Sequence, residues 1–139
     1  MEINQENLFD KALASYQSGA EASTLLNDFE EITSISPNQS AAWTCLAWLQ
    51  LLCNKNEAAL KSAKNAVQLN GQDPQARINL CLALLETNSK GVREHIDFVK
   101  RAVLVLPDLE KELKASIQDG LNRKPNWQSL EKIKDWLNF

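Results

Sequence analysis

The sequence predicts an all-α protein, a right-handed solenoid in which antiparallel helix hairpins stack side by side. Three observations support this prediction. The segment around Trp43 and Leu46 is echoed 34 residues later around Arg77 and Leu80, and a fixed period of this length is typical of stacked helical repeats. Only 4 glycines and 4 prolines interrupt the 139 residues, which are rich in good helix formers. No segment alternates strictly between apolar and polar residues, so no strand is predicted.

The chain is expected to form one domain, because 139 residues are enough to bury a core without disulfides or metals. Residues 1–139 are therefore treated as one stack of hairpins. The predicted repeat units, the last of them degenerate, are 6–39, 40–73, 74–109 and 110–139.

The first hairpin is predicted from apolar spacing and from two helix breaks. Helices are expected over residues 5–18 and 22–35. Gly19 marks the end of the first, and Pro37 ends the second because proline cannot continue the hydrogen-bond ladder. Apolar residues recur every three or four positions, the spacing of one helical face. They are Leu8, Phe9, Ala12, Leu13 and Tyr16, then Leu25, Leu26, Phe29, Ile32 and Ile35.

The second hairpin is expected over residues 41–53 and 57–69, joined by a turn at 54–56. Ser40 has the side chain of an N-cap for the first of these helices. Asn70 and Gly71 end the second. The apolar face of the second helix consists of Leu60, Ala63, Ala66, Val67 and Leu69.

The third hairpin is expected to begin at Asp73, an N-cap residue followed by Pro74 at the first helical position. This helix is predicted to reach Thr87. A longer turn over 88–91 then leads to a helix over 92–105, which Pro107 closes.

Two further helices complete the prediction. Asp108 is expected to cap a helix over 109–121, and a break at 123–126 precedes a helix over 126–138. The apolar faces are Leu109, Leu113, Ile117 and Leu121, then Trp127, Leu130, Ile133, Trp136 and Leu137.

The repeat pattern resembles the tetratricopeptide repeat family. That family places an aromatic residue, a leucine, a small residue and a tyrosine on a first helix, and spaced alanines on a second. The second unit matches with Trp43, Leu46 and Ala47, then Ala59, Ala63 and Ala66. The first matches with Phe9, Ala12, Leu13 and Tyr16, then Leu25, Phe29, Ile32 and Pro37. The third matches with Arg77, Leu80 and Cys81, then His95, Val99, Ala102 and Pro107, and the fourth with Leu113, Ser116 and Ile117, then Ser129, Ile133 and Trp136.

Four positions depart from the family pattern. Arg77 replaces the aromatic residue, Cys81 replaces the small residue, Gln50 replaces tyrosine and Gly71 stands where proline is usual. Small residues let the two helices of a hairpin approach closely, and neighbouring hairpins must stack because one unit cannot bury its apolar face alone.

The resemblance implies that the first helix of each hairpin lines a concave groove. On this basis the expected partner-binding groove is apolar in the middle and polar at one end. Its residues are Asp10, Ala14, Gln17, Thr44, Trp48, Leu51, Ile78, Leu82 and Leu85. Some family members grip a terminal carboxylate with lysine and asparagine side chains at six of these positions, namely Asp10, Ala14, Thr44, Trp48, Ile78 and Leu82 here, so no such clamp is expected.

An exposed apolar groove normally meets a partner, and three interpretations of it stay open. In the first interpretation, the groove holds an amphipathic helix or extended peptide of another protein. Alternatively, the C-terminal unit folds back and fills it with Trp127, Leu130, Trp136 or Phe139. In the third interpretation, tight superhelical curvature buries the stripe.

Composition and charge argue against several classes of function. The formal charge is −3, and residues 1–40 carry seven acids and one base, whereas the rest carry a net +3. This asymmetry indicates either an acidic capping end or a gradient that orients a partner. The short basic pairs lack interleaved aromatics, so nucleic-acid binding is not expected. The most apolar stretch, residues 43–53, is too short to cross a bilayer. Residues 1–6 do not resemble a signal peptide.

No catalytic or metal-binding constellation is visible. The lone histidine, His95, has no ligand set at metal spacing. The three cysteines are Cys45, Cys53 and Cys81, and they form no Cys-x-x-Cys pair, which favours a reducing, cytoplasmic compartment. Cys53, close to a turn, is the only thiol considered for reactivity. We therefore expect neither enzyme activity nor a cofactor.

The function predicted from the sequence is a non-catalytic protein-interaction module, an adaptor or assembly factor that binds a helix or peptide of another protein in the concave groove. The alternative is a small dedicated chaperone for a secreted or membrane-bound client. The sequence does not indicate an oligomeric state.

Overall fold

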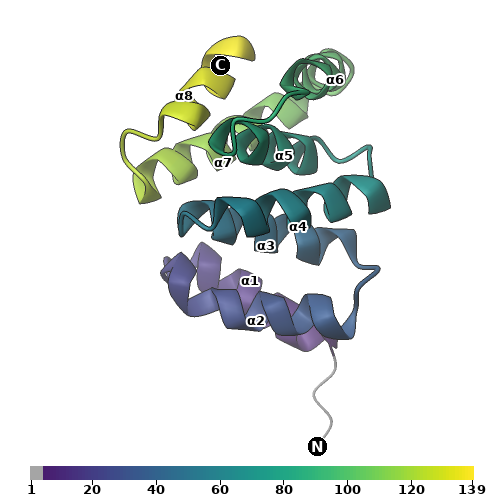
Figure 1. The fold of residues 1–139 in the computed structure, drawn as a ribbon, viewed down its shortest axis with the longest axis vertical. Coiled ribbons are helices and arrows are strands. Elements are labelled where there is room, and N and C mark those ends of the chain that lie inside the picture. Colours follow the sequence, from purple (N-terminus) through teal and green to yellow (C-terminus); the bar gives the residue numbers. More distant parts are fainter. Residues whose placement is uncertain (1–4) are drawn as a thin grey trace, which may run out of the picture.

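A computed structural model describes the backbone of residues 5–139 and the side chains of residues 8–139. The described residues form eight helices and no strand, as predicted (Figure 1). The expectation about residues 1–6 falls mostly outside the described part. The helices are α1 (Gln5–Gln17), α2 (Ala22–Ile35), α3 (Ser40–Leu52), α4 (Asn56–Leu69), α5 (Pro74–Glu86), α6 (Val92–Val105), α7 (Pro107–Arg123) and α8 (Gln128–Trp136).

The first six helices stack in sequence as antiparallel pairs. Each of them makes its main contacts with the helix before and the helix after it, and α3 also touches α5. In Figure 1, α1 and α2 form one end of the stack, and α6, α7 and α8 lie around the other. The pattern then changes, because α8 packs against α5 and α7 lies between α6 and α8. The limits of the four repeat units stay a prediction.

Local sequence explains several helix ends. Asp73 caps α5, and its side chain accepts a hydrogen bond from the Gln75 amide at 3.0 Å. Gly19 takes a positive φ of 100° just after α1, a conformation that glycine adopts without a steric cost.

Two predicted caps are wrong. Ser40 lies inside α3, whose N-cap is Gln39. Asp108 lies in the first turn of α7 rather than capping it, because Pro107 already takes the first helical position after Leu106. Proline suits that position since its missing amide hydrogen would have no intrahelical partner.

The core runs through the stack in three groups of buried side chains. One joins α1, α2 and α3 around Phe29 and Ile32. A small one joins α3, α4 and α5 through Ala47 and Ala63. The largest joins α3, α5 and α6 to α7 and α8, and it includes Trp48 and Trp127. The C-terminal helices therefore belong to the folded body.

The departures from the repeat pattern each acquire a polar partner. The Gln50 side chain, buried where tyrosine is usual, accepts a hydrogen bond from the Ser62 hydroxyl at 2.7 Å. The Cys81 thiol is buried and lies 3.7 Å from the Val92 carbonyl oxygen, to which it donates. Satisfied buried polar groups of this kind cost little stability.

Arg77 fills the aromatic position by binding three groups at once. Its Nε donates to the Gly71 carbonyl at 2.9 Å, and its guanidinium lies 4.3 Å from the centre of the Phe98 ring. Its Nη1 lies 3.0 Å from Nδ1 of His95. An arginine only donates, so Nδ1 of His95 is the acceptor and the imidazole is neutral.

The three cysteines are all unpaired. Within residues 5–139, no helix combines the length and the apolar character needed to span a membrane.

A pH dependence follows from His95. Burial lowers the pKa of this imidazole below its usual range, and the Arg77 charge acts in the same direction, against Glu94. As the pH falls, His95 takes up its proton in the unfolded state at a higher pH than in the folded state. The free energy of unfolding therefore falls as the pH drops below about 6.5. We expect His95→Gln to reduce this loss, measured by urea unfolding at pH 7.5 and 5.5. An equal loss in both proteins would contradict the assignment.

Candidate functional site

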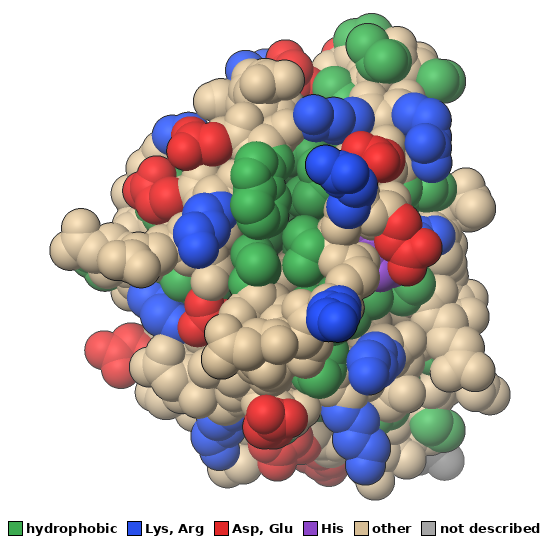
Figure 2. Space-filling view, turned by 45° about the horizontal axis from the view of Figure 1, so that its top comes forward, with side chains coloured by type: hydrophobic (Ala, Val, Ile, Leu, Met, Phe, Trp, Pro, Cys, Tyr) green, Lys and Arg blue, Asp and Glu red, His purple; other side chains and the backbone are tan. Residues whose placement is uncertain are grey.

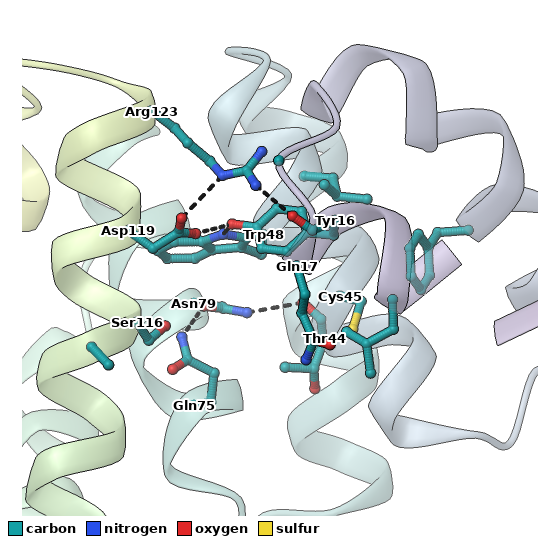
Figure 3. Close-up of a pocket in the computed structure, with 15 residues that line it drawn as sticks. Tyr16, Gln17, Thr44, Cys45, Trp48, Gln75, Asn79, Ser116, Asp119 and Arg123 are labelled. Atoms are coloured by element: carbon teal, nitrogen blue, oxygen red, sulfur yellow. Dashed lines mark hydrogen bonds and ion pairs between the residues drawn. The ribbon is translucent and has the colours of Figure 1, made fainter. Parts of the chain in front are cut away.

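The candidate site is a groove of about 540 Å³ between the inner helices α1, α3 and α5 and the crossing helix α7 (Figure 3). Apolar and aromatic side chains form much of its wall, and uncharged amides and hydroxyls supply the polar atoms. The apolar group comprises Leu13, Tyr16, Phe29, Cys45, Trp48, Leu49 and Ala115. The uncharged polar group comprises Gln17, Thr44, Gln75, Asn79 and Ser116.

A hydrogen-bonded set of four side chains, here called the clasp, joins α7 to α1 and α3. The indole Nε1 of Trp48 donates to the Tyr16 hydroxyl at 2.7 Å, and that hydroxyl donates to Asp119. The other oxygen of Asp119 pairs with Nε of Arg123 at 3.2 Å. Figure 3 shows this chain of contacts along one side of the groove.

Arg123 fixes the end of α7 to the end of α1. Its two terminal nitrogens donate to the carbonyls of Tyr16 and Ala20, each at 2.7 Å. Its guanidinium also lies 3.8 Å from the centre of the Tyr16 ring. Tyr16 lies in the last turn of α1, where the helix carbonyls carry a partial negative charge, so the guanidinium stabilises this end of α1.

Lys124 plays the same part for α3. Its ammonium donates to the Leu51 carbonyl at 3.1 Å and to the side chain of Asn54 at 2.6 Å. It also lies 4.6 Å from the centre of the Trp127 ring. Two consecutive basic residues thus bind the ends of two inner helices and hold α7 beside them.

Burial shapes the protonation of the groove. Burial raises the pKa of the Tyr16 phenol, and the hydrogen bond to Asp119 adds to this effect, so Tyr16 stays a neutral donor. Burial raises the pKa of the Cys45 thiol to about 12, which leaves it protonated. Asp119 and Arg123 offset each other, so the groove presents no uncompensated charge.

A buried amide fixes the opposite side of the groove. Asn79 is fully buried, and its side chain donates to the Thr44 carbonyl at 2.9 Å, linking α5 to α3. Its oxygen accepts from the Gln75 side chain at 2.9 Å. These bonds hold the two inner helices in register, and they leave one amide side chain, Gln75, half-buried at the groove.

The C-terminal segment packs on the middle of the stack. The rings of Trp48 and Trp127 lie 5.7 Å apart between centroids. Gly120 sits directly on Trp48: a Cβ at this position would lie 2.7 Å from Cη2 of Trp48 and 2.7 Å from Cδ2 of Leu130. Only glycine allows α7 to come this close.

The structure places the predicted groove residues in three settings. Gln17, Thr44 and Trp48 line the groove between α1, α3, α5 and α7. The expectation that Leu51, Ile78 and Leu82 line an open groove is corrected, because all three are fully buried in the core that α8 closes. Leu85 is partly buried against the same core, and Asp10 and Ala14 are exposed outside the groove. A role of these residues in partner binding stays a prediction.

The physical reason for this correction is the fold-back of the C-terminal unit, one of the three interpretations left open. Trp127 and Leu130 are buried against Trp48, whereas Trp136 remains 42% exposed. What remains accessible is the part of the concave face near α1.

Several residues of the site were not predicted. Asp119 and Arg123 lie one helical turn apart, which is the spacing of an ion pair, but the sequence does not show that they reach α1. Gly120 could have been noticed in the sequence, since a glycine inside a helix usually has a packing reason. Nothing in the local sequence marks Asn79 as a buried residue that links two helices.

Neither His95 nor Cys53 lines the groove. His95 is held under Arg77 outside the groove. The pKa of the Cys53 thiol is raised by burial, which disfavours the reactive thiolate. Within the described residues, no three acidic, histidine or cysteine side chains are grouped as metal ligands would be.

Comparison with solved structures relates the fold to a known protein. The chain is similar to the crystal structure of the type III secretion translocator chaperone SycD of Yersinia enterocolitica, solved as an alternative dimer, with a TM-score of 0.66. The two share 17% sequence identity over 94% of this chain and 91% of that one. No family model and no curated protein matches the chain. The likeness confirms the predicted fold class of stacked helix hairpins.

The contact at Gly120 predicts the effect of one added methyl group. Alanine favours a helix interior by about 1 kcal/mol over glycine, but overpacking costs about 1–3 kcal/mol. We expect Gly120→Ala to lower the free energy of unfolding in urea, while Lys111→Ala, an exposed change on the same helix, stays near wild type. A Gly120→Ala protein more stable than wild type would rule out the close packing.

The clasp predicts a second effect. Tyr16→Phe keeps the ring beside Arg123 but removes the hydroxyl that Trp48 and Asp119 share. We expect a loss of about 1–2 kcal/mol in the free energy of unfolding. Gln118→Ala, which removes an exposed hydrogen bond to Asn122, serves as control and should change stability little. Equal stabilities of the two variants would refute the clasp.

Proposed function

We propose that this protein is a non-catalytic interaction module that holds a segment of another protein in the groove between α1, α3, α5 and α7. The observation that supports this most directly is the composition of the groove: an apolar, aromatic wall with uncharged amides and hydroxyls beside it. Apolar side chains of a partner would pack on the wall, and its main-chain groups would pair with the amides.

The groove has a volume of about 540 Å³ and is open to solvent on one side. The proposed ligand is a short stretch of a partner's chain, either extended or about one turn of helix. Because Asp119 and Arg123 compensate each other, uncharged apolar residues suit this groove better than a charged terminus or nucleic acid.

The same groups argue for binding rather than reaction. Tyr16 and Cys45 are held in their protonated forms, and the only charged side chains of the groove are paired with each other. A general base or nucleophile would need a less protonated group in this place.

The three unpaired cysteines favour a reducing compartment, so we place the proposed binding activity in the cytoplasm.

A dedicated chaperone for a secreted or membrane-bound client is the second candidate. The likeness to a type III secretion translocator chaperone favours it. The two candidates differ in what happens to the partner. A client of a chaperone would be degraded or aggregate when produced alone and be rescued by co-expression, whereas the partner of an adaptor would be stable without it.

A pair of tryptophan substitutions on α7 tests the groove. Ala115→Trp places a large ring in the groove from an exposed position, and Gln118→Trp places the same ring on α7 outside it. In pull-downs from the native cell, read by mass spectrometry, we expect Ala115→Trp to lose at least about tenfold of the partner signal that wild type and Gln118→Trp retain. Equal capture by all three proteins would refute binding in the groove.

A further inference from the structure

An uncovered apolar run lies at the end of α6. Leu104, Val105 and Leu106 are 82%, 76% and 59% exposed. Hydrophobic side chains gather at the upper right edge of Figure 2, on the side of the molecule where α6 lies, with lysine or arginine side chains beside them. Three consecutive aliphatic side chains this exposed form a patch that normally meets another surface.

The last residue of each second helix is exposed in all three hairpins. Ile35 ends α2 and Leu69 ends α4, and they are 50% and 42% exposed. The end of α6 differs in having three exposed aliphatic side chains in a row, which α7 leaves open to solvent as it begins at Pro107.

The end of α2 occupies the equivalent place in the first unit. Helices α2 and α6 have the same length, 14 residues, and begin 70 residues apart, so Ile35 corresponds to Val105. Residues 21–30 and 91–100 also show the same order of exposed and buried positions. Like Val105, Ile35 is an exposed aliphatic side chain, 50% exposed.

The charges beside these two ends are opposite. Glu30 and Glu31 precede Ile35 by about one turn, and Lys100 and Arg101 stand at the corresponding positions of α6. All four are exposed, and none makes an ion pair in the part of the chain that the structure describes. The charge of the whole chain follows the same division, with a net −6 over residues 1–40 and +3 over the rest.

We propose that this protein associates with a second copy of itself, the acidic end of α2 (Glu30, Glu31 and Ile35) docking on the basic end of α6 (Lys100, Arg101 and Leu104–Leu106). Burial of the aliphatic side chains supplies the attraction, and the opposite charges select the partner and set the orientation. A second copy is the occupant that the chain itself supports, because it carries the complementary surface in the equivalent structural position.

This contact leaves the groove free. None of the residues at either end lines the groove between α1, α3, α5 and α7. Self-association and partner binding are therefore separate properties, and the failure of one would leave the other standing.

Charge reversal tests the proposal. One double variant, Glu30→Lys with Glu31→Lys, makes both ends basic, and another, Lys100→Glu with Arg101→Glu, makes both acidic. In sedimentation velocity at low salt we expect wild type to associate as its concentration rises, and each variant to associate at least about tenfold more weakly. A 1:1 mixture of the two variants should recover association, since each supplies the end that the other lacks.

Salt provides a second test of the charges. Association of wild type should weaken in about 1 M salt, where screening is strong.

The apolar part has its own variant. Leu104→Ser introduces at α6 the residue type that α2 carries at Ser34, the corresponding position, and should weaken association without a change in the circular dichroism spectrum. Wild type that stays monomeric at every concentration, association that neither charge reversal weakens, or a mixture that remains monomeric would each overturn the proposal.

Discussion

The packing around one side chain, Trp48, determines how the rest of the molecule is arranged. This indole meets Trp127 from the C-terminal segment, lies under Gly120 of α7 and donates its hydrogen to Tyr16 of α1. A residue of the inner helix α3 thereby ties the first and last parts of the chain together. Because an unpartnered indole of this size would expose a large apolar surface, the fold-back of the last two helices follows from it.

The two C-terminal helices have different structural roles. Helix α8 closes the core, since Leu130 and Ile133 are completely buried. Helix α7 instead forms a wall, buried on one side through Leu113 and Ile117 and held to α1 by polar contacts at its end. A stack that would otherwise have one long concave face thus keeps a shorter groove near α1. Its charged wall residues are paired with each other, so the groove favours uncharged segments.

The positions of the helices could be predicted from the sequence, but the contacts between residues far apart along the chain could not. Apolar spacing identified all eight helices to within about two residues, because periodicity reports which face of a helix is buried. It does not report what covers that face, and so the stripe through Leu51, Ile78 and Leu82 was expected to be open. The position of α7 depends on Gly120 and on Arg123, and these contacts lie more than 70 residues away along the chain at Trp48 and Tyr16. The buried amide of Asn79 gave no local pattern at all.

Amide hydrogen exchange of the whole chain tests most directly whether the C-terminal segment is part of the folded core. If Trp127, Leu130 and Ile133 close that core, the amides of α8 should exchange as slowly as those of α3 and α5, through opening of the whole domain. Exchange of α8 within seconds, while α3 and α5 stay protected, would show that the segment is a detachable arm and would contradict the account.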